Sequence, residues 1–337
     1  MAISAVLPYA GPRILERVAT AAREGLAQQP KRLPPWLFYD EAGSLLFDAI
    51  TRLPEYYVTR TERAILEADA GAMIARAAAG ERLRIAELGA GSADKTRLLL
   101  AAASRRQGPV IYEPIDVSGT ALEAAQERIE RELPRVRVEP QVMDYTEPFD
   151  LEPAADGERR LVLYIGSSIG NFEPREAEQL LECVRGSLQP GDALLLGVDL
   201  VKEDSILVPA YDDAAGVTAA FNRNVLVRLN RELGADFDAD AFVHRAVWNE
   251  ASSRMEMHLE SCTAQTVRMD AIDALVEFDE GERIHTENSY KYRPGQAERM
   301  LEQAGFRPEA TWKDARGWFA VCLGRVGTRD QGLGTRD

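Results

Sequence analysis

The feature that most constrains the fold is a regular alternation of strand-like and helix-like segments between residues 83 and 200. Short apolar runs of strand length are separated by stretches in which apolar residues recur at helical spacing. The expected strands are residues 83–88, 110–116, 136–143, 161–165 and 193–198. The expected helices are residues 92–104, residues 119–133 and one that begins at Pro174. Strands that alternate with helices favour a parallel sheet covered on both faces, so the pattern predicts an α/β fold.

The alternation stops after Leu200 and resumes after Arg293, which indicates an inserted domain. Between these points we expect a helix around 209–232 and antiparallel strands at 255–259 and 266–269. The expected domains and tail are as follows: an α/β domain of residues 62–200 and 290–326, an α+β domain of residues 1–61 and 201–289, and a tail of residues 327–337. The first 61 residues are assigned to the insertion because the α/β pattern starts only after them. The tail has almost no apolar residue to bury, so we expect it to be disordered.

A helix is also expected just before the first strand of the α/β domain. Thr59-Arg60-Thr61-Glu62 has the pattern of a capping box, in which the first hydroxyl and the last carboxylate satisfy backbone amides at a helix start. We therefore expect this helix to begin at Thr59 and to continue to about Ala78.

The charge of the chain excludes some classes of partner. Lys and Arg number 40 and Asp and Glu number 55, which gives a formal net charge of −15. Phosphate binding requires an excess of cations, so we expect neither a nucleic-acid nor a membrane partner. No uncharged run approaches the roughly 18 residues that a membrane span requires.

The cysteines and histidines bear on compartment and metal binding. The 3 cysteines cannot form a disulfide framework, which favours a reducing compartment, and residues 1–12 lack the features of a signal peptide. We therefore expect a cytoplasmic protein, and we expect it to be a monomer. His244, His258 and His285 lack metal-ligand spacing, so we interpret them as structural and expect no metal.

A two-glycine turn, Glu87-Leu88-Gly89-Ala90-Gly91, follows the first expected strand. Glycine allows a tight turn and a close approach of ligand to backbone. The dinucleotide fingerprint requires a third glycine at position 94, where Asp94 would face a pyrophosphate, so a nicotinamide cofactor is disfavoured. The turn is similar to motif I of the class I methyltransferases, which bind S-adenosylmethionine. The positive sulfonium of that ligand suits an acidic site.

Two aspartates follow the next two expected strands. Asp116 ends the second strand and could accept hydrogen bonds from ribose hydroxyls, and Asp144 ends the third and could accept from an adenine amino group. Alternatively, each aspartate caps the segment that follows it. Three such positions in sheet order favour a cofactor site over capping alone.

A small-residue loop, Gly166-Ser167-Ser168-Ile169-Gly170-Asn171-Phe172, follows the fourth expected strand. Its small residues allow a ligand to approach, and Asn171 offers both a donor and an acceptor. The alternative is an ordinary turn in which Asn171 caps the helix that begins at Pro174.

Five segments in order carry a resemblance to a known family: 38–44, 53–62, 87–91, 165–172 and 284–291. With them the chain resembles the L-histidine Nα-methyltransferase family of ergothioneine biosynthesis, over about residues 13–325. The resemblance implies a class I (Rossmann-like) methyltransferase domain with an inserted α+β substrate domain. It also implies trimethylation of the α-amine of L-histidine, which gives hercynine and three molecules of S-adenosylhomocysteine.

The resemblance further implies roles for individual residues. The residues implied to contact S-adenosylmethionine are Gly89, Lys95, Asp116, Asp144 and Tyr145. Asn171 and Tyr211 would hold the substrate carboxylate, and Glu287 and Ser289 would hold its imidazole. The residues implied to line the imidazole pocket are Tyr56 and Met257, and those implied to lie near the amine are Gly166, Ser168 and Tyr39. Tyr39, Ser168 and Asn171 are thus the implied catalytic residues, and Ser168 stands where we expect threonine in this family.

Other interpretations stay open from the residues alone. Tyr39 and Tyr56 could be ordinary core aromatics, Met257 core filler and Glu287 a solvated charge. The chain could methylate another free amino acid, such as tyrosine or tryptophan. It could also be a sensor that binds the nucleotide without catalysis, and a nicotinamide dehydrogenase is the least favoured reading because of Asp94.

Overall fold

The computed structural model describes residues 12–91, 93–146 and 149–327. The predicted disordered tail therefore lies outside the described residues, apart from Gly327. The chain forms two compact units. We call the one made of residues 1–57 and 203–289 the insertion unit, and the one made of residues 58–202 and 290–337 the α/β unit. These divisions fall a few residues from the boundaries expected at 61/62 and 200/201.

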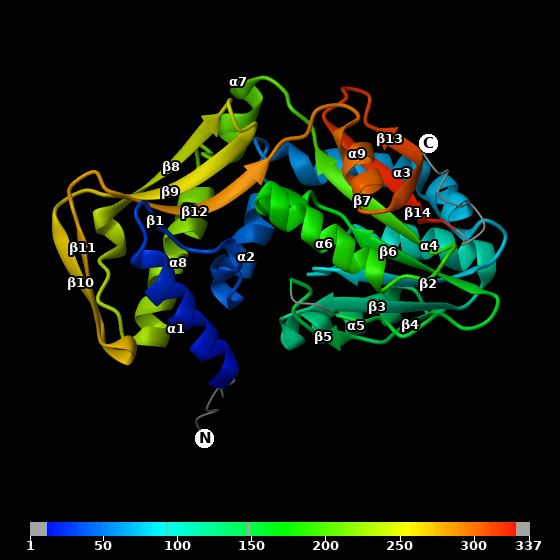
Figure 1. Ribbon diagram of the computed structural model, residues 1–337, viewed down its shortest axis with the longest axis horizontal. Helices are drawn as coiled ribbons and strands as arrows, with labels where there is room; N and C mark the ends of the chain where they lie inside the picture. Colours follow the sequence, from blue (N-terminus) through cyan, green and yellow to red (C-terminus); the bar gives the residue numbers. More distant parts are fainter. Residues whose placement is uncertain (1–11, 92, 147–148, 328–337) are drawn as a thin grey trace, which may run out of the picture. The chain divides into compact units, whose positions relative to one another are not determined.

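The α/β unit is built on one eight-stranded sheet (Figure 1). Its strand order is β13-β14-β7-β6-β2-β3-β4, and β5 also pairs with β3. The strands are β2 (Arg82–Leu88), β3 (Val110–Asp116), β4 (Val136–Val138), β5 (Gln141–Val142), β6 (Glu158–Tyr164), β7 (Ala193–Asp199), β13 (Phe306–Lys313) and β14 (Phe319–Val326). Strands β2 to β7 pair in parallel, whereas β14 is antiparallel to both β7 and β13. This topology confirms the predicted α/β, Rossmann-like fold.

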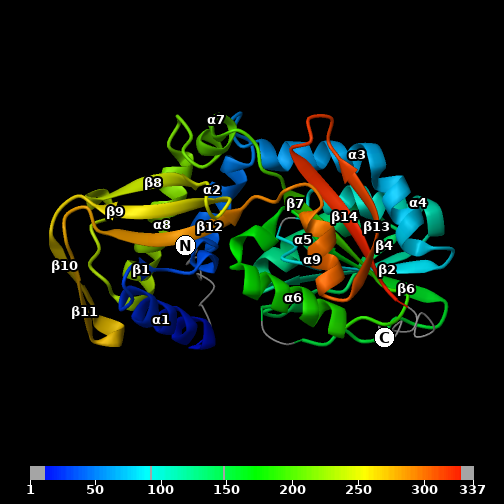
Figure 2. The same cartoon turned by 45° about the horizontal axis from the view of Figure 1, so that its top comes forward.

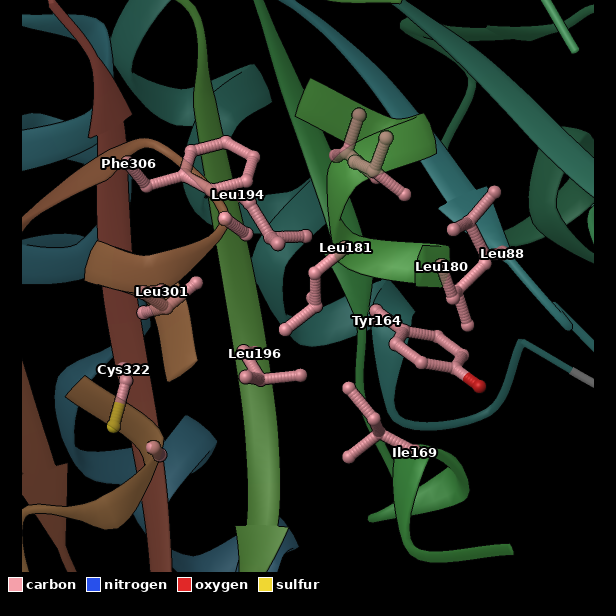
Figure 3. Close-up of a cluster of buried hydrophobic side chains, with 14 of the residues drawn as sticks. Leu88, Tyr164, Ile169, Leu180, Leu181, Leu194, Leu196, Leu301, Phe306 and Cys322 are labelled. Carbon is pink, nitrogen blue, oxygen red and sulfur yellow. The ribbon is translucent and has the colours of Figure 1, made fainter. Parts of the chain in front are cut away.

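Both faces of this sheet are covered, which explains the continuous apolar runs. The helices of the unit are α3 (Tyr57–Ala78), α4 (Thr96–Gln107), α5 (Gly119–Glu132), α6 (Pro174–Gly186) and α9 (Gln296–Gln303). All seven residues of β7 are buried, so neither face of that strand meets solvent. On one face, Leu181 of α6 and Leu301 of α9 join Leu196 of β7 in a single apolar cluster (Figure 3).

Local chemistry shifts two of the predicted boundaries. The third strand is interrupted at Glu139–Pro140 and becomes β4 and β5, because proline cannot donate a hydrogen bond to its neighbour. Helix α4 begins at Thr96 and not at residue 92. Ala93 has a φ of +49°, a left-handed conformation that belongs to a turn and not to a helix.

The insertion unit has a four-stranded sheet in the order β1-β12-β9-β8 and a separate β10-β11 pair. Its elements are α1 (Pro12–Leu26), β1 (Lys31–Arg32), α2 (Glu41–Ile50), α7 (Asp204–Leu207), α8 (Val217–Leu233), β8 (Phe242–Asn249), β9 (Arg254–Ser261), β10 (Gln265–Met269), β11 (Ala274–Phe278) and β12 (Arg283–Tyr290), whose last residue belongs to the other unit. Helix α8 lies against this sheet (Figure 2). Alternate residues of β9 are buried, as expected for a strand with one covered face.

The helix expected at 209–232 begins later, at Val217. Gly216 precedes it with a φ of +72°, so the chain turns sharply there. The two expected strands at 255–259 and 266–269 are both antiparallel, but each pairs with a different partner, β8 and β11.

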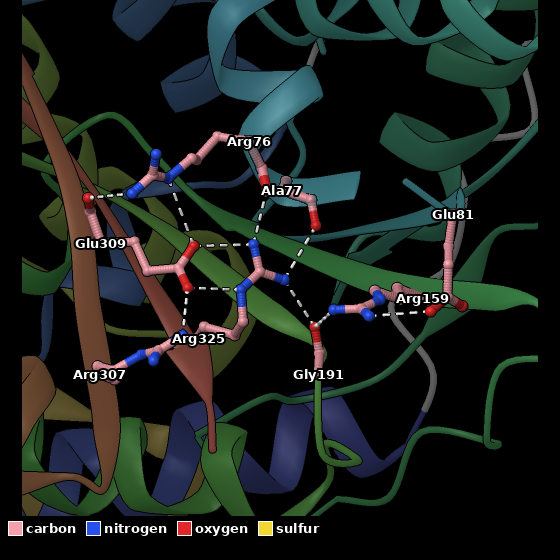
Figure 4. A network of polar contacts seen from close by, with 8 residues as sticks. All are labelled: Arg76, Ala77, Glu81, Arg159, Gly191, Arg307, Glu309 and Arg325. Atoms are coloured by element: carbon pink, nitrogen blue, oxygen red, sulfur yellow. Dashed lines mark hydrogen bonds and ion pairs between the residues drawn. The ribbon is translucent and has the colours of Figure 1, made fainter. Parts of the chain in front are cut away.

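A buried arginine, Arg325, stabilises the antiparallel strands β13 and β14 of the α/β unit (Figure 4). Arg325 of β14 donates to both carboxylate oxygens of Glu309 on β13, at 2.8 and 2.9 Å. It also donates to the carbonyls of Arg76, Ala77 and Gly191, at 2.6, 3.1 and 2.8 Å. One guanidinium thus joins the end of α3 to β13, to β14 and to the turn before β7.

Cys183, Cys262 and Cys322 are all free thiols. Within the ranges that the structure describes, no helix combines the length and the apolar character that crossing a membrane requires.

Candidate functional site

The two-glycine turn lies between the end of β2 and the start of α4. Gly89 and Gly91 have φ values of +66° and +48°, in the region that favours glycine. A Cβ at Gly89 would lie 3.0 Å from the hydroxyl oxygen of Tyr145, so that position is also crowded. A Cβ at Gly91 would meet no described atom within 4 Å. The turn therefore leaves open backbone at Gly91, which a ligand could approach.

Glu87 is buried beneath the glycine turn and joins its two ends. Its carboxylate is buried and accepts a 2.6 Å hydrogen bond from the Thr96 hydroxyl and another from the Tyr112 hydroxyl. Burial raises the pKa of Glu87 to about 7. Because Thr96 is the first residue of α4, Glu87 joins the two ends of the turn. Glu87 belongs to the predicted glycine motif, but its role in joining the ends of the turn is not predicted by the sequence pattern.

Asp116 lies at the carboxyl end of β3 and contacts the same turn. One of its carboxylate oxygens accepts from the Gly91 amide at 3.2 Å, and the other accepts from the Ser118 amide at 3.0 Å. The N-cap of α5 is Ser118, which accepts from the Ala121 amide. Asp116 is therefore not a helix cap, and its carboxylate retains acceptor capacity for ligand hydroxyls.

Asp144 and Tyr145 follow β5, and Tyr145 reaches the glycine turn. Asp144 accepts from the Thr146 amide and hydroxyl at 3.0 and 2.6 Å, so it also holds its own turn. Burial, together with the charges of Asp116 and Asp144, raises the pKa of Tyr145 to about 12, which keeps its hydroxyl neutral. Because the Tyr145 hydroxyl lies close to Gly89, this tyrosine is beside the glycine turn.

Lys95 and Glu62 connect the glycine turn to the loop after β6. Glu62 is fully buried, forms an ion pair with Lys95, and accepts from the Gly166 amide at 2.8 Å. The expected capping box is wrong, because α3 already begins at Tyr57 and Thr59 lies inside it. The signal that could have revealed Glu62 is its place on the apolar stripe of α3, four residues after the buried Val58 and three before the buried Ile65.

The loop after β6 carries three of the predicted site residues: Gly166, Ser168 and Asn171. Residues Ser168–Asn171 form a short 3-10 turn, and Asn171 is half-buried at its end. Ser167 has a φ of +61°, and its hydroxyl accepts from the Asp199 amide at 2.9 Å. The N-cap of α6 is Glu173, within a capping box that includes Glu176. The alternative reading of Asn171 as the cap of this helix is therefore wrong.

The predicted tyrosines of the insertion unit form one aromatic cluster. The ring of Phe47 on α2 lies 5.6 Å from that of Tyr39 and 6.2 Å from that of Tyr56, measured between centroids. Tyr56 in turn lies 6.5 Å from Tyr211, and Tyr39 lies 5.8 Å from Phe221 of α8. Phe47 sits between two predicted site residues, and sequence reasoning missed it because its own pattern is that of an ordinary helical apolar residue.

Tyr211 and Ser289 are brought together by a 2.7 Å hydrogen bond between their hydroxyls. Glu287 is half-buried and lies two residues before Ser289 on β12. Met257 on β9 is buried, and its carbonyl accepts from the Thr286 hydroxyl at 3.0 Å. The structure thus groups the predicted site residues into two sets, one in each unit.

His244 supports this region and is structural, as expected. Its Nε2 lies 2.8 Å from the carbonyl oxygen of Tyr211, and its Nδ1 lies 2.8 Å from the side-chain nitrogen of Asn222. Burial lowers the pKa of His244, which favours the neutral imidazole.

Comparison with known proteins covers nearly the whole chain. The sequence profile of the histidine-specific, S-adenosylmethionine-dependent methyltransferases matches residues 18–326. Histidine N-alpha-methyltransferase of Mycolicibacterium smegmatis is 46% identical over 323 residues, which cover 96% of this chain and 99% of that protein. Its namesake from Mycobacterium tuberculosis is 47% identical over 299 residues, covering 89% of this chain and 92% of that protein. Ergothioneine biosynthesis protein 1 of Neurospora crassa is 30% identical over 288 residues, 84% of this chain but 32% of that protein.

Proposed function

Because the chain belongs to the family of histidine-specific, S-adenosylmethionine-dependent methyltransferases, we propose that it trimethylates the α-amino group of L-histidine. The products would be hercynine and three molecules of S-adenosylhomocysteine, as the first step of ergothioneine biosynthesis. The observation that carries this proposal is the family match over residues 18–326, which spans both sets of site residues.

The set in the α/β unit fits the methyl donor. S-adenosylmethionine supplies an electrophilic methyl group on a positively charged sulfonium. The two-glycine turn offers open backbone at Gly91, and Asp116 has acceptor capacity left for ribose hydroxyls. Asp144 would accept from the adenine amino group, and Lys95 and Tyr145 would complete the contacts. Carboxylates beside the turn suit a cationic ligand better than a pyrophosphate.

The substrate would be held at its two ends. Asn171 and Tyr211 would bind the carboxylate, while Glu287 and Ser289 would bind the imidazole beside Tyr56 and Met257. Fixing a reactant in its reacting geometry can lower a barrier by roughly 7–11 kcal/mol, which makes positioning the main contribution to rate. A carboxylate placed to bind an imidazole disfavours substrates with apolar side chains, because it would have no hydrogen-bond partner on them.

Gly166, Ser168 and Tyr39 would lie near the reacting amine. The amine needs its lone pair free, and it can release protons to water between rounds, so we assign no obligatory general base. The product is a quaternary ammonium, which tyrosine faces stabilise by about 0.5–2 kcal/mol. This gives the rings of Tyr39 and Tyr56 a physical role beyond packing. Displacement at a sulfonium needs no Lewis acid, so we propose that methyl transfer is independent of metal.

We also propose that the protein is a cytoplasmic monomer with no nucleic-acid or membrane partner. The net charge of −15 and the three free cysteines support this proposal. Light scattering at working concentration tests the monomer, and a mass of two chains would contradict it.

Product analysis tests the substrate. The protein is incubated with S-adenosylmethionine and each free amino acid in turn, and the products are identified by mass spectrometry. We expect mono-, di- and trimethylated histidine. Methylated tyrosine or tryptophan with unmodified histidine would contradict the substrate and leave the methyltransferase class intact.

A further inference from the structure

Three potential metal ligands meet on the sheet of the insertion unit. Glu256 and His258 come from β9 and His285 comes from β12, the neighbouring strand. One carboxylate oxygen and one nitrogen from each imidazole all lie within 4.8 Å of one another. The two imidazole centroids are 5.0 Å apart. No metal-ligand spacing is visible along the sequence because the cluster depends on the pairing of two strands that are separated along the chain.

The polar atoms of this cluster are incompletely satisfied. His258 Nε2 lies 3.2 Å from Glu256 Oε2. His285 Nε2 is buried and has no hydrogen-bond partner among the described residues. A buried polar atom that lacks a partner lowers the free energy of unfolding by about 1–3 kcal/mol, so an ion bound to His285 Nε2 would remove this destabilisation.

The protonation states in the cluster are those that metal binding requires. Burial lowers the pKa of His258, and burial together with the neighbouring His258 lowers that of His285 to about 4. Burial opposes ionisation of Glu256, but hydrogen bonds from Asn249 and Arg254 hold its pKa at about 2. At neutral pH the cluster therefore offers two neutral imidazoles and one carboxylate, the forms that ligate metals.

We propose that Glu256, His258 and His285 bind one divalent transition-metal ion of borderline softness, with Zn²⁺ as the reference ion. Two imidazoles and a carboxylate form a donor set that such ions accept, with the remaining coordination positions left to water. Neighbouring cations limit the affinity: Arg254 donates to Glu256 at 2.8 Å, and the charges of Arg32 and Arg283 act on the imidazoles. The site should therefore bind more weakly than a closed structural site with four protein ligands.

The proposed metal site borders a residue that is assigned to the substrate. His285 and Glu287 are two residues apart on β12, so they lie on the same face of the strand. Glu287 is assigned to the substrate, and a Glu287→Gln variant shows whether its carboxylate also contributes to the metal site.

Metal titration of the untagged full-length protein tests the proposal. The buffer must contain no histidine, because free histidine chelates Zn²⁺. Calorimetry should show one Zn²⁺ per chain, and Co²⁺ should give visible absorption bands of a nitrogen- and oxygen-ligated site. His258→Ala and His285→Gln should each weaken Zn²⁺ binding at least tenfold and abolish the Co²⁺ bands, while the exposed control Glu250→Gln should change neither. Circular dichroism of each variant confirms folding.

Unchanged Zn²⁺ affinity in folded His285→Gln would overturn the proposal, as would the absence of Co²⁺ bands in the parent protein. Loss of binding in Glu287→Gln but not in Glu256→Gln would also overturn it, because the carboxylate ligand would then be a different one.

Discussion

At the scale of single residues, Glu62 shows how one buried carboxylate can connect two parts of a site. It pairs with Lys95 beside the glycine turn and accepts from the amide of Gly166 in the loop after β6. The facing strand provides the space, because a Cβ at Gly197 would lie 2.5 Å from a Glu62 oxygen. Glu62 therefore positions both Lys95, a proposed cofactor contact, and the loop after β6.

A Glu62→Gln substitution separates its charge from its shape. The amide oxygen can still accept from Gly166, but Lys95 loses the negative charge that holds it. A charge-assisted hydrogen bond contributes about 1.5–3 kcal/mol, so we expect S-adenosylmethionine to bind at least tenfold more weakly by calorimetry. Glu67→Gln, on the exposed side of α3, is the matched control. Unchanged affinity in Glu62→Gln would show that the ion pair does not position Lys95 for the cofactor.

The raised pKa of Glu87 makes the stability of the protein depend on pH. Its pKa is about 7 in the folded protein, against an ordinary value of 4.5. Between these values the folded state holds a proton that the unfolded state has lost, so the free energy of unfolding falls as the pH rises. Above pH 7 the free energy of unfolding is therefore lower by about 3 kcal/mol than it would be if Glu87 had its ordinary pKa.

Glu87→Gln removes this dependence. Relative to the parent protein, the variant should gain stability as the pH is raised from 5 to 8, as measured by urea unfolding. A difference in free energy that is the same at both pH values would mean that Glu87 is not the titrating group.

At the scale of elements, helix α2 organises the aromatic cluster. Asp40 caps the helix by accepting from the Gly43 amide at 2.7 Å, and Asn224 of α8 donates to the same carboxylate at 2.8 Å. This fixes the orientation of α2 relative to α8 within the insertion unit. Phe47 is thereby held between the rings of Tyr39 and Tyr56.

Phe47→Leu should affect the substrate and spare the cofactor. Edge-on aromatic contacts contribute about 0.5–1.5 kcal/mol each, and two of them position proposed substrate-site tyrosines. We expect kcat/KM for histidine to fall about tenfold while the affinity for S-adenosylmethionine stays within twofold. Leu45→Ala, an exposed change on the same helix, is the control. An equal loss for both ligands would indicate that the variant has lost its fold and not its tyrosine positions.

The local sequence pattern predicted the positions of strands well where the apolar residues of the pattern are the residues that are buried in the structure. Strands β2, β3, β6 and β7 follow the expected runs because each is buried on both faces. The break at Pro140 and the late start of α4 depend on single residues in turns, where periodicity carries no information. The metal-ligand cluster and the Glu62 contacts depend on which strands and helices become neighbours, and no local pattern encodes that.

At the scale of the whole molecule, the predicted site residues divide between two units that are each compact. The residues found from sequence lie mainly at strand ends, where an α/β sheet places ligands, or in segments shared with the family. The residues that were not predicted, Glu62 and Phe47, contact predicted site residues and hold them in position. The apolar stripe of α3 could have marked Glu62 as buried, but its partners, like the position of Phe47 between two tyrosines, follow only from the contacts between elements.

We propose that residues of both units bind the same histidine molecule, and the histidine affinity of single variants in each unit tests this proposal. Calorimetry with S-adenosylhomocysteine present should show that Asn171→Ala, in the α/β unit, and Glu287→Ala, in the insertion unit, each weaken histidine binding at least tenfold. Both variants should bind S-adenosylhomocysteine within twofold of the parent, and the exposed control Glu280→Ala should change neither affinity. Unchanged histidine affinity in either site variant would contradict the account.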